Sequence, residues 1–175
     1  MKSRFTFAVI AVLACAAFAQ NVPTFKLAST SGKSFTQADL KGKPTLLVFL
    51  KAGCPHNPKS MPDFTRLSKQ VAGKMNLVLV TNITQSEAKP YAKEIKSSLP
   101  LVSDPNRVLI KLAGAKHSLD MGLVSSDGKK IVATYEGYSK QVLAQVLADV
   151  VASGGPKLNL DLSKYPSSLQ SGCSF

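Results

Sequence analysis

The sequence predicts an α/β fold in which a mixed central sheet carries helices on both faces. Two continuous apolar runs, TLLVFLKA at 45–52 and MNLVLVT at 75–81, are typical of strands buried on both faces. A helix-patterned segment separates them, as the crossover between parallel strands requires. The segment 121–137, MGLVSSDGKKIVATYEG, predicts an antiparallel hairpin around Ser126-Asp127-Gly128. Parallel and antiparallel strands are therefore expected in one sheet.

Residues 22–44 precede the first buried strand. Their pattern predicts a short strand, a turn at Ser31-Gly32-Lys33 and a short helical turn that ends at Gly42. After the buried strand, apolar residues recur at helical spacing from Pro58 onward and predict a helix with one buried stripe. Gly73 ends this helix. The stripe consists of Met61, Phe64, Leu67 and Val71.

Two more helices are predicted between the second buried strand and the hairpin. Residues 86–97 form the first, with Pro90 tolerated only near its first turn. The segment 103–114, SDPNRVLIKLAG, predicts a short capped helix with Asp104 as its N-cap and Pro105 at its first position. Each helix connects strands, which is why we expect them to cover the sheet.

The chain closes with an amphipathic helix at 139–153 and a segment at 154–175 that is rich in Gly, Pro and Ser. We therefore expect one domain at 20–153 and a C-terminal tail at 154–175 that carries Cys173. The hydrophobic content of 45% is enough for one sizeable core.

Residues 1–19 are predicted to be a signal peptide. Two basic residues precede the apolar run 5–13, which is too short to cross a bilayer, and Ala17-Phe18-Ala19 is a typical cleavage site. We expect cleavage before Gln20 and a secreted or periplasmic protein. As an alternative, VLAC at 12–15 resembles a lipobox, and acylation of Cys15 would tether the protein to a membrane.

The chain is basic, with 22 Lys and Arg against 10 Asp and Glu. The formal net charge is +12, and it falls to +10 without residues 1–19, which hold two basic residues and no acidic ones. The lysines are scattered singly, without runs or interleaved aromatic residues. This pattern favours a solvated basic surface over a nucleic-acid interface.

Cys54 lies where a buried strand passes into a helix. Unpaired amide groups and the positive end of the helix dipole favour a thiolate there. Pro55 suits the start of a helix, and Lys51 and His56 would add positive charge nearby. A partly accessible thiolate of this kind attacks disulfides or peroxides. The alternative is a cysteine that only packs in the core.

The segment 22–67 resembles the opening of the extracytoplasmic thioredoxin-like redoxins. The matching features are the F-x-L strand, the connector GKSFTQADLKGKP, the apolar strand that leads into Cys54-Pro55, and Pro62 eight residues after Cys54. This superfamily contains the thiol–disulfide oxidoreductases and the alkyl hydroperoxide reductase/thiol-specific antioxidant proteins. The resemblance covers about 22–152 and implies a thioredoxin-like three-layer fold.

The sequence departs from these relatives at the motif itself. Asn57 stands where thioredoxins carry the second cysteine of Cys-x-x-Cys. Peroxiredoxins carry Pro and Thr or Ser where this chain has Leu47 and Lys51, so this chain lacks those residues of the peroxidase pocket.

Three further positions differ from the relatives. The buried carboxylate of thioredoxins would fall at Val48, and the helix glutamate of some secreted relatives at Ser60. The cis-proline of the loop before the hairpin would fall near Leu119. Without that proline, the resemblance does not imply substrate docking by backbone pairing.

A lone Cys54 needs a second thiol to release a mixed disulfide. Cys173 in the tail is the candidate. A flexible tail of about 20 residues spans tens of ångströms at most, which is enough for Cys173 to reach Cys54. The alternative is that Cys173 is an exposed thiol or pairs between molecules.

Other chemistry ranks lower. Cys54, His56 and His117 could hold copper, but Pro58 replaces the second cysteine of Cys-x-x-x-Cys, so we expect no metal. Arg66 and Arg107 are expected to be ordinary surface residues of helices.

The sequence thus predicts an extracytoplasmic redox protein with Cys54 as nucleophile and no cofactor. Its partners would be thiol or disulfide proteins, small thiols or peroxides. The alternative is a thioredoxin-fold binding or scaffold module without redox turnover. The substrate, the electron donor, the oligomeric state and the role of Cys173 stay open at this point.

Overall fold

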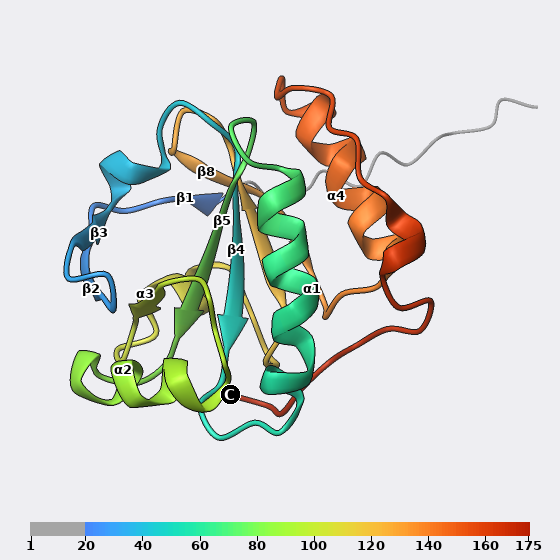
Figure 1. The fold of residues 1–175 in the computed structure, drawn as a ribbon. Coiled ribbons are helices and arrows are strands. Elements are labelled where there is room, and N and C mark those ends of the chain that lie inside the picture. The colour runs from blue at the N-terminus through green and yellow to red at the C-terminus, as the bar shows by residue number, and fades with distance from the viewer. Residues whose placement is uncertain (1–19) are drawn as a thin grey trace, which may run out of the picture.

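The computed structural model describes residues 20–175 as eight strands, four α-helices and two 3₁₀ helices (Figure 1). The strands are β1 (Gln20–Asn21), β2 (Lys26–Ser29), β3 (Ser34–Thr36), β4 (Thr45–Leu50), β5 (Asn76–Thr81), β6 (Leu101–Ser103), β7 (Met121–Val124) and β8 (Lys130–Tyr135). The helices are η1 (Gln37–Leu40), α1 (His56–Gln70), α2 (Gln85–Glu94), α3 (Val108–Leu112), α4 (Lys140–Ala152) and η2 (Leu162–Lys164).

The strands form one sheet in the order β1-β8-β7-β4-β5-β6-β2-β3. β4, β5 and β6 are parallel, whereas β7 and β8 on one side and β2 and β3 on the other run antiparallel. In the centre, Val48 of β4 pairs with Leu79 of β5 and with Met121 of β7. This arrangement confirms the predicted mixed sheet.

Alternate residues of β4 point into two different cores. Leu46, Val48 and Leu50 pack in a cluster with apolar residues of α1, α2 and α4. Leu47 and Phe49 pack in a second cluster with residues of η1 and α3. Because successive side chains of a strand face opposite sides, these clusters lie on opposite faces of the sheet. The three-layer arrangement is therefore confirmed, and all six residues of β4 are buried.

The short strands β1, β3 and β6 were not among the predicted elements. They contain two or three residues each, too few for a period of two to appear in the sequence. β6 overlaps the predicted helical segment 103–114 only at Ser103. Its pairing with β5 identifies it as a strand.

The start of α3 differs from the prediction. The helix begins at Val108, and Pro105 lies in the turn before it. Asp104 still caps this helix, because its carboxylate accepts the N–H groups of Val108 at 2.7 Å, Leu109 at 2.9 Å and Ile110 at 3.2 Å. The intervening turn needs a left-handed residue, and Arg107 adopts φ +57°.

The place of Pro90 in α2 also differs from the prediction, which put it near the first turn. Pro90 is the sixth residue of the helix and lies past its first turn. The helix starts with a capping box, in which Glu87 accepts the Thr84 N–H at 2.9 Å.

The tail lies along the domain. Leu158 and Tyr165 are buried in the core cluster that includes α1 and α4. The Tyr165 hydroxyl donates to Gln70 Oε1 at 2.6 Å, and Lys140 N–H donates to the Pro166 carbonyl at 2.8 Å. In Figure 1 the red segment then returns to the end of β4 and the start of α1. The tail is thus held in place along much of its length.

No helix within residues 20–175 combines the length and the apolar character that a membrane crossing needs. The predicted signal peptide and the alternative acylation site at Cys15 lie outside the described residues.

Candidate thiol site

Cys54 lies in the turn between β4 and α1. Gly53, with φ +75°, allows the chain to reverse, and the Cys54 N–H donates to the Lys51 carbonyl at 3.3 Å. Pro55 occupies the N-cap position of α1, which begins at His56. Only 3% of Cys54 is exposed. The strand-to-helix position predicted for this cysteine is present, but the side chain is covered.

Asn57 is fully buried and ties three segments together. Its amide nitrogen donates to the Lys51 carbonyl at 2.8 Å and to the Tyr91 hydroxyl at 2.7 Å, and its amide oxygen accepts the Ser118 hydroxyl at 2.7 Å. The Ser118 oxygen in turn accepts the Lys51 N–H at 2.9 Å. The position of a second motif sulfur is therefore filled by a hydrogen-bonded amide.

The loop before β7 is held by several hydrogen bonds from its own residues and from β4. The Asp120 carboxylate accepts the N–H groups of Lys116 and His117 at 2.8 Å and of Gly137 at 2.9 Å. Leu119 adopts φ +76° and donates its N–H to the Phe49 carbonyl at 2.7 Å. A proline at this position could not donate, so leucine makes a bond that the expected residue would lack.

The end of the tail pairs with this loop in antiparallel fashion. The Gly172 N–H donates to the Ser118 carbonyl at 2.9 Å, and the Ser118 N–H donates to the Cys173 carbonyl at 2.8 Å. The Phe175 N–H donates to the Lys116 carbonyl at 2.9 Å. Backbone pairing at this loop is therefore made despite the missing proline.

The tail brings Cys173 to Cys54. The Cys173 N–H donates to Cys54 Sγ at 3.0 Å, although the two residues are 119 positions apart. Both cysteines are free thiols in this structure, and Cys173 is the more accessible of the two. The sequence could not establish this contact, because it depends on the path of the whole tail.

The two thiols have opposite pKa shifts. Burial raises the pKa of Cys54, but hydrogen bonds from the Cys173 thiol, the Cys173 N–H and the His56 N–H outweigh it, so the pKa is lowered. The pKa of Cys173 is raised, first by its hydrogen bond to Cys54 and then by burial and the negative charge of Cys54. Cys54 is therefore the more acidic thiol of the pair, and Cys173 is the one that keeps its proton to higher pH.

The other predicted residues contribute in different ways. The Lys51 charge lowers the pKa of Cys173. His56 is exposed and acts through its backbone N–H, and the His117 ring lies 3.9 Å from the Asp120 carboxylate. Val48 packs in the core, and the Ser60 hydroxyl donates to the His56 carbonyl at 3.1 Å.

Neither arginine points to the thiols. Arg66 donates to Asp63 at 2.7 Å and to the Lys164 carbonyl at 2.9 Å, and Arg107 lies 6.0 Å from the centre of the Phe175 ring. Within the described residues no three His, Cys, Asp or Glu side chains gather as a metal site would require.

Several residues of this site were missed from the sequence. Tyr91 was not singled out in the sequence, and Ser118, Asp120 and Gly172 were given no role in the site. Gly172 immediately before Cys173 is the one signal that could have indicated a close backbone approach.

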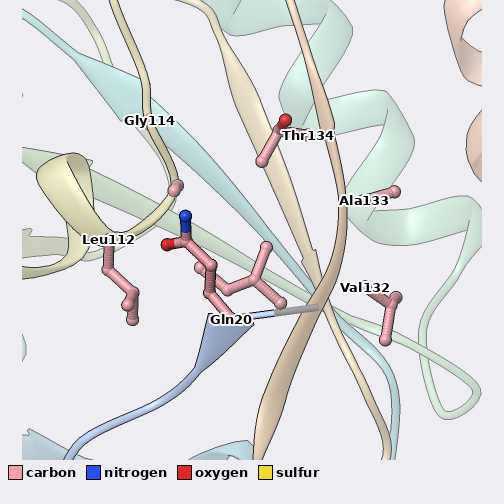
Figure 2. A pocket seen from close by; sticks show the side chains of 8 residues that line it. Gln20, Leu112, Gly114, Val132, Ala133 and Thr134 are labelled. Carbon is pink, nitrogen blue, oxygen red and sulfur yellow. The ribbon is translucent and has the colours of Figure 1, made fainter. Parts of the chain in front are cut away.

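A pocket of about 280 Å³ lies elsewhere, between β1, β8 and the end of α3 (Figure 2). Gln20, Leu112, Gly114 and Thr134 are among its lining residues. The lining contains no thiol and no ionisable side chain, so it lacks the groups for acid–base or nucleophilic chemistry.

Comparison with known proteins agrees with the predicted resemblance. Residues 18–140 match the AhpC/TSA family. The thioredoxin-like protein YneN of Bacillus subtilis (strain 168) is 31% identical over 90 residues, which are 49% of this chain and 52% of that protein. The chain thus spans about half the length of the curated relative that it matches.

Solved structures share the fold. The exposed lipoprotein thioredoxin of Streptococcus pneumoniae strain TIGR4 superposes with a TM-score of 0.64 at 24% identity, over 73% of this chain and 99% of that one. Peroxiredoxin Q of Xanthomonas campestris superposes with a TM-score of 0.60 at 16% identity, over 74% of this chain and 91% of that one. The thioredoxin-like fold is therefore confirmed.

Proposed function

The chain belongs to the AhpC/TSA family, a membership that indicates thiol-dependent redox chemistry in general, and we propose that it is a thiol–disulfide oxidoreductase using Cys54 and Cys173. The observation that carries the proposal is the 3.0 Å hydrogen bond from the Cys173 N–H to Cys54 Sγ. Together with the opposite pKa shifts of the two thiols, it supports an attacking thiolate beside a protonated resolving thiol.

In the first step the Cys54 thiolate attacks one sulfur of a substrate disulfide. The bond from Cys54 to that sulfur forms, the substrate S–S bond breaks, and the other substrate sulfur leaves as a thiolate. Hydrogen bonds from Cys173 and from the His56 N–H lower the pKa of Cys54 and so favour its ionised form before this step. The Asn57 amide fixes the turn of Lys51 and thereby positions the nucleophile.

In the second step Cys173 resolves the mixed disulfide. Once Cys54 is bonded to the substrate it carries no charge. Two causes of the raised pKa of Cys173 then disappear, the hydrogen bond to Cys54 and the negative charge of Cys54, while the Lys51 charge remains. The Cys173 thiol then releases its proton to solvent and attacks Cys54 Sγ. A Cys54–Cys173 disulfide forms, and the second substrate sulfur leaves as a thiolate. The substrate is reduced by two electrons, and an external thiol must restore the protein.

Disulfides are the favoured substrates over peroxides. The positions at which peroxiredoxins carry Pro and Thr or Ser are Leu47, buried in β4, and Lys51, whose N–H is bonded to Ser118. Peroxide reduction stays the second candidate, supported by the family membership alone.

We propose an extracytoplasmic location as well, on the pattern of residues 1–19. Such compartments allow disulfides to form and persist, which suits a protein that exchanges them.

The test uses the full chain from residue 20, glutathione disulfide as oxidant and mass spectrometry. Wild type should form the Cys54–Cys173 linkage, Cys173→Ser should accumulate one bound glutathione, and Cys54→Ser should react slowly. Failure of the wild type to form the Cys54–Cys173 linkage would instead favour a binding module without turnover. Faster reaction with hydrogen peroxide than with glutathione disulfide would favour the second candidate.

A further inference from the structure

The last six residues of the tail, 170–175, form an added strand on the body of the protein. We call this segment the tail strand and the backbone that it pairs with, residues 116–118 and Tyr138, the docking edge. Five backbone hydrogen bonds of 2.8–2.9 Å join the two, including a reciprocal pair between Gln170 and Tyr138. Strand addition of this kind recognises the backbone of an extended peptide and leaves specificity to the space around its side chains.

Cys54 is closed off while the tail strand is in place. Its exposed fraction is 3%, and its sulfur is bonded to the Cys173 N–H. A protein disulfide attacked by Cys54 would have to approach the same sulfur, where the tail strand already lies. The tail strand and a substrate segment therefore compete for one position.

The docking edge leaves no room for a side chain just before the docked cysteine. A Cβ on Gly172 would lie 2.7 Å from Ser118 Cβ, 2.9 Å from the Ser118 carbonyl oxygen and 3.1 Å from Cys54 Sγ. The first two distances are shorter than real Cβ contacts, so the chain would have to move. Gly172 is not in the left-handed region, so the restriction comes from space and not from backbone strain.

The residue after the docked Cys-Ser pair, Phe175, packs on an apolar surface. Phe175 packs against the cluster that contains Leu109 and Ile110, and Arg107 lies over its ring. The docked sequence thus has three recognisable features: backbone pairing, glycine before the cysteine, and an aromatic residue two positions after it.

We propose that the docking edge binds extended segments of partner proteins with the pattern Gly-Cys-x-aromatic, and that the tail strand is the built-in competitor that they must displace. The inference rests on the proposed function and specifies its substrate class. Partner disulfides with a larger residue before the attacked cysteine are disfavoured.

The test compares two peptide disulfides on full-length protein in which Cys173→Ser stops the reaction at the mixed disulfide. The peptides are Gln-Ser-Gly-Cys-Ser-Phe and its Gly→Ala form, each joined through cysteine to 5-thio-2-nitrobenzoate. Cys54 attacks the peptide sulfur, and the coloured thionitrobenzoate leaves as a thiolate. Two variants in this background weaken docking by different contacts: Gly172→Ala through the clash and Gln170→Pro through the lost N–H donor to Tyr138. The matched control is the exposed Ser174→Ala.

Both docking variants should react with the glycine peptide at least about tenfold faster than Cys173→Ser alone, whereas Ser174→Ala should not. On either docking variant the glycine peptide should react at least about tenfold faster than the alanine peptide. Equal rates for the two peptides, or no acceleration in both docking variants, would overturn the inference.

A small disulfide separates this outcome from failure of the proposed function. If Cys54 of the docking variants reacts rapidly with 5,5′-dithiobis(2-nitrobenzoate) but does not discriminate the peptides, only the docking inference fails. If neither the docking variants nor Cys173→Ser alone react with it faster than an ordinary cysteine, the proposed function fails with the docking inference.

Discussion

Truncating Asn57 to alanine should destabilise the fold by several kcal/mol, about 3–5 kcal/mol. The substitution removes three buried hydrogen bonds of 2.7–2.8 Å, to Lys51, Tyr91 and Ser118. The Tyr91 hydroxyl can still donate to the Lys51 carbonyl, at 3.4 Å, but the Ser118 hydroxyl proton loses its acceptor in a fully buried position.

The magnitude follows from these losses. Net losses of about 1 kcal/mol for each of two bonds and about 1–3 kcal/mol for the stranded hydroxyl give about 3–5 kcal/mol. Since domains of this size are stable by about 5–15 kcal/mol, the variant should still fold.

The assay is urea unfolding of the reduced protein, with Asn82→Ala as the matched control. Asn82 accepts one hydrogen bond, from the Ala52 N–H at 2.9 Å, so its loss should cost about 1 kcal/mol. Equal losses in the two variants would refute the view that Asn57 links the motif turn to α2 and the loop before β7.

Four further predictions concern the thiols and the two capping carboxylates. Cys173→Ala should raise the pKa of Cys54 and Cys173→Ser should raise it less, because the hydroxyl still donates; the ultraviolet absorbance of the thiolate measures both. Since the pKa of Cys54 is lower in the folded than in the unfolded protein, its ionisation stabilises the fold above the unfolded pKa. That stability is lost as the pH falls through the folded pKa. In urea unfolding of Cys173→Ser, the free energy of unfolding should therefore fall as the pH is lowered through that range, and a rise would contradict the prediction. Asp120→Ala removes the acceptor of three backbone N–H groups and should cost about 3 kcal/mol in thermal or urea unfolding, with a loss under 1 kcal/mol counting against the capping role. Asp104→Ala should cost about 2 kcal/mol by the same measurement, and no change would mean that α3 does not depend on its cap.

Local patterns were sufficient where burial follows a regular period. The runs at 45–52 and 75–81 predicted β4 and β5, and the stripe from Met61 to Val71 predicted α1. They failed where tertiary contacts decide the conformation. α3 begins late because the Asp104 carboxylate reaches over a left-handed Arg107, and β6 exists because β5 and β2 flank it.

The sequence by itself determined the mixed three-layer fold, the position of Cys54 between strand and helix, and the absence of a second sulfur at Asn57. Only the tertiary structure decided that Asn57 is a buried link and that Cys173 lies against Cys54. The reason is physical: periodicity reports which face of an element is buried, and this is a local property. Contacts such as Asn57 with Tyr91 or Cys173 with Cys54 join residues 34 and 119 positions apart and depend on the path of the whole chain.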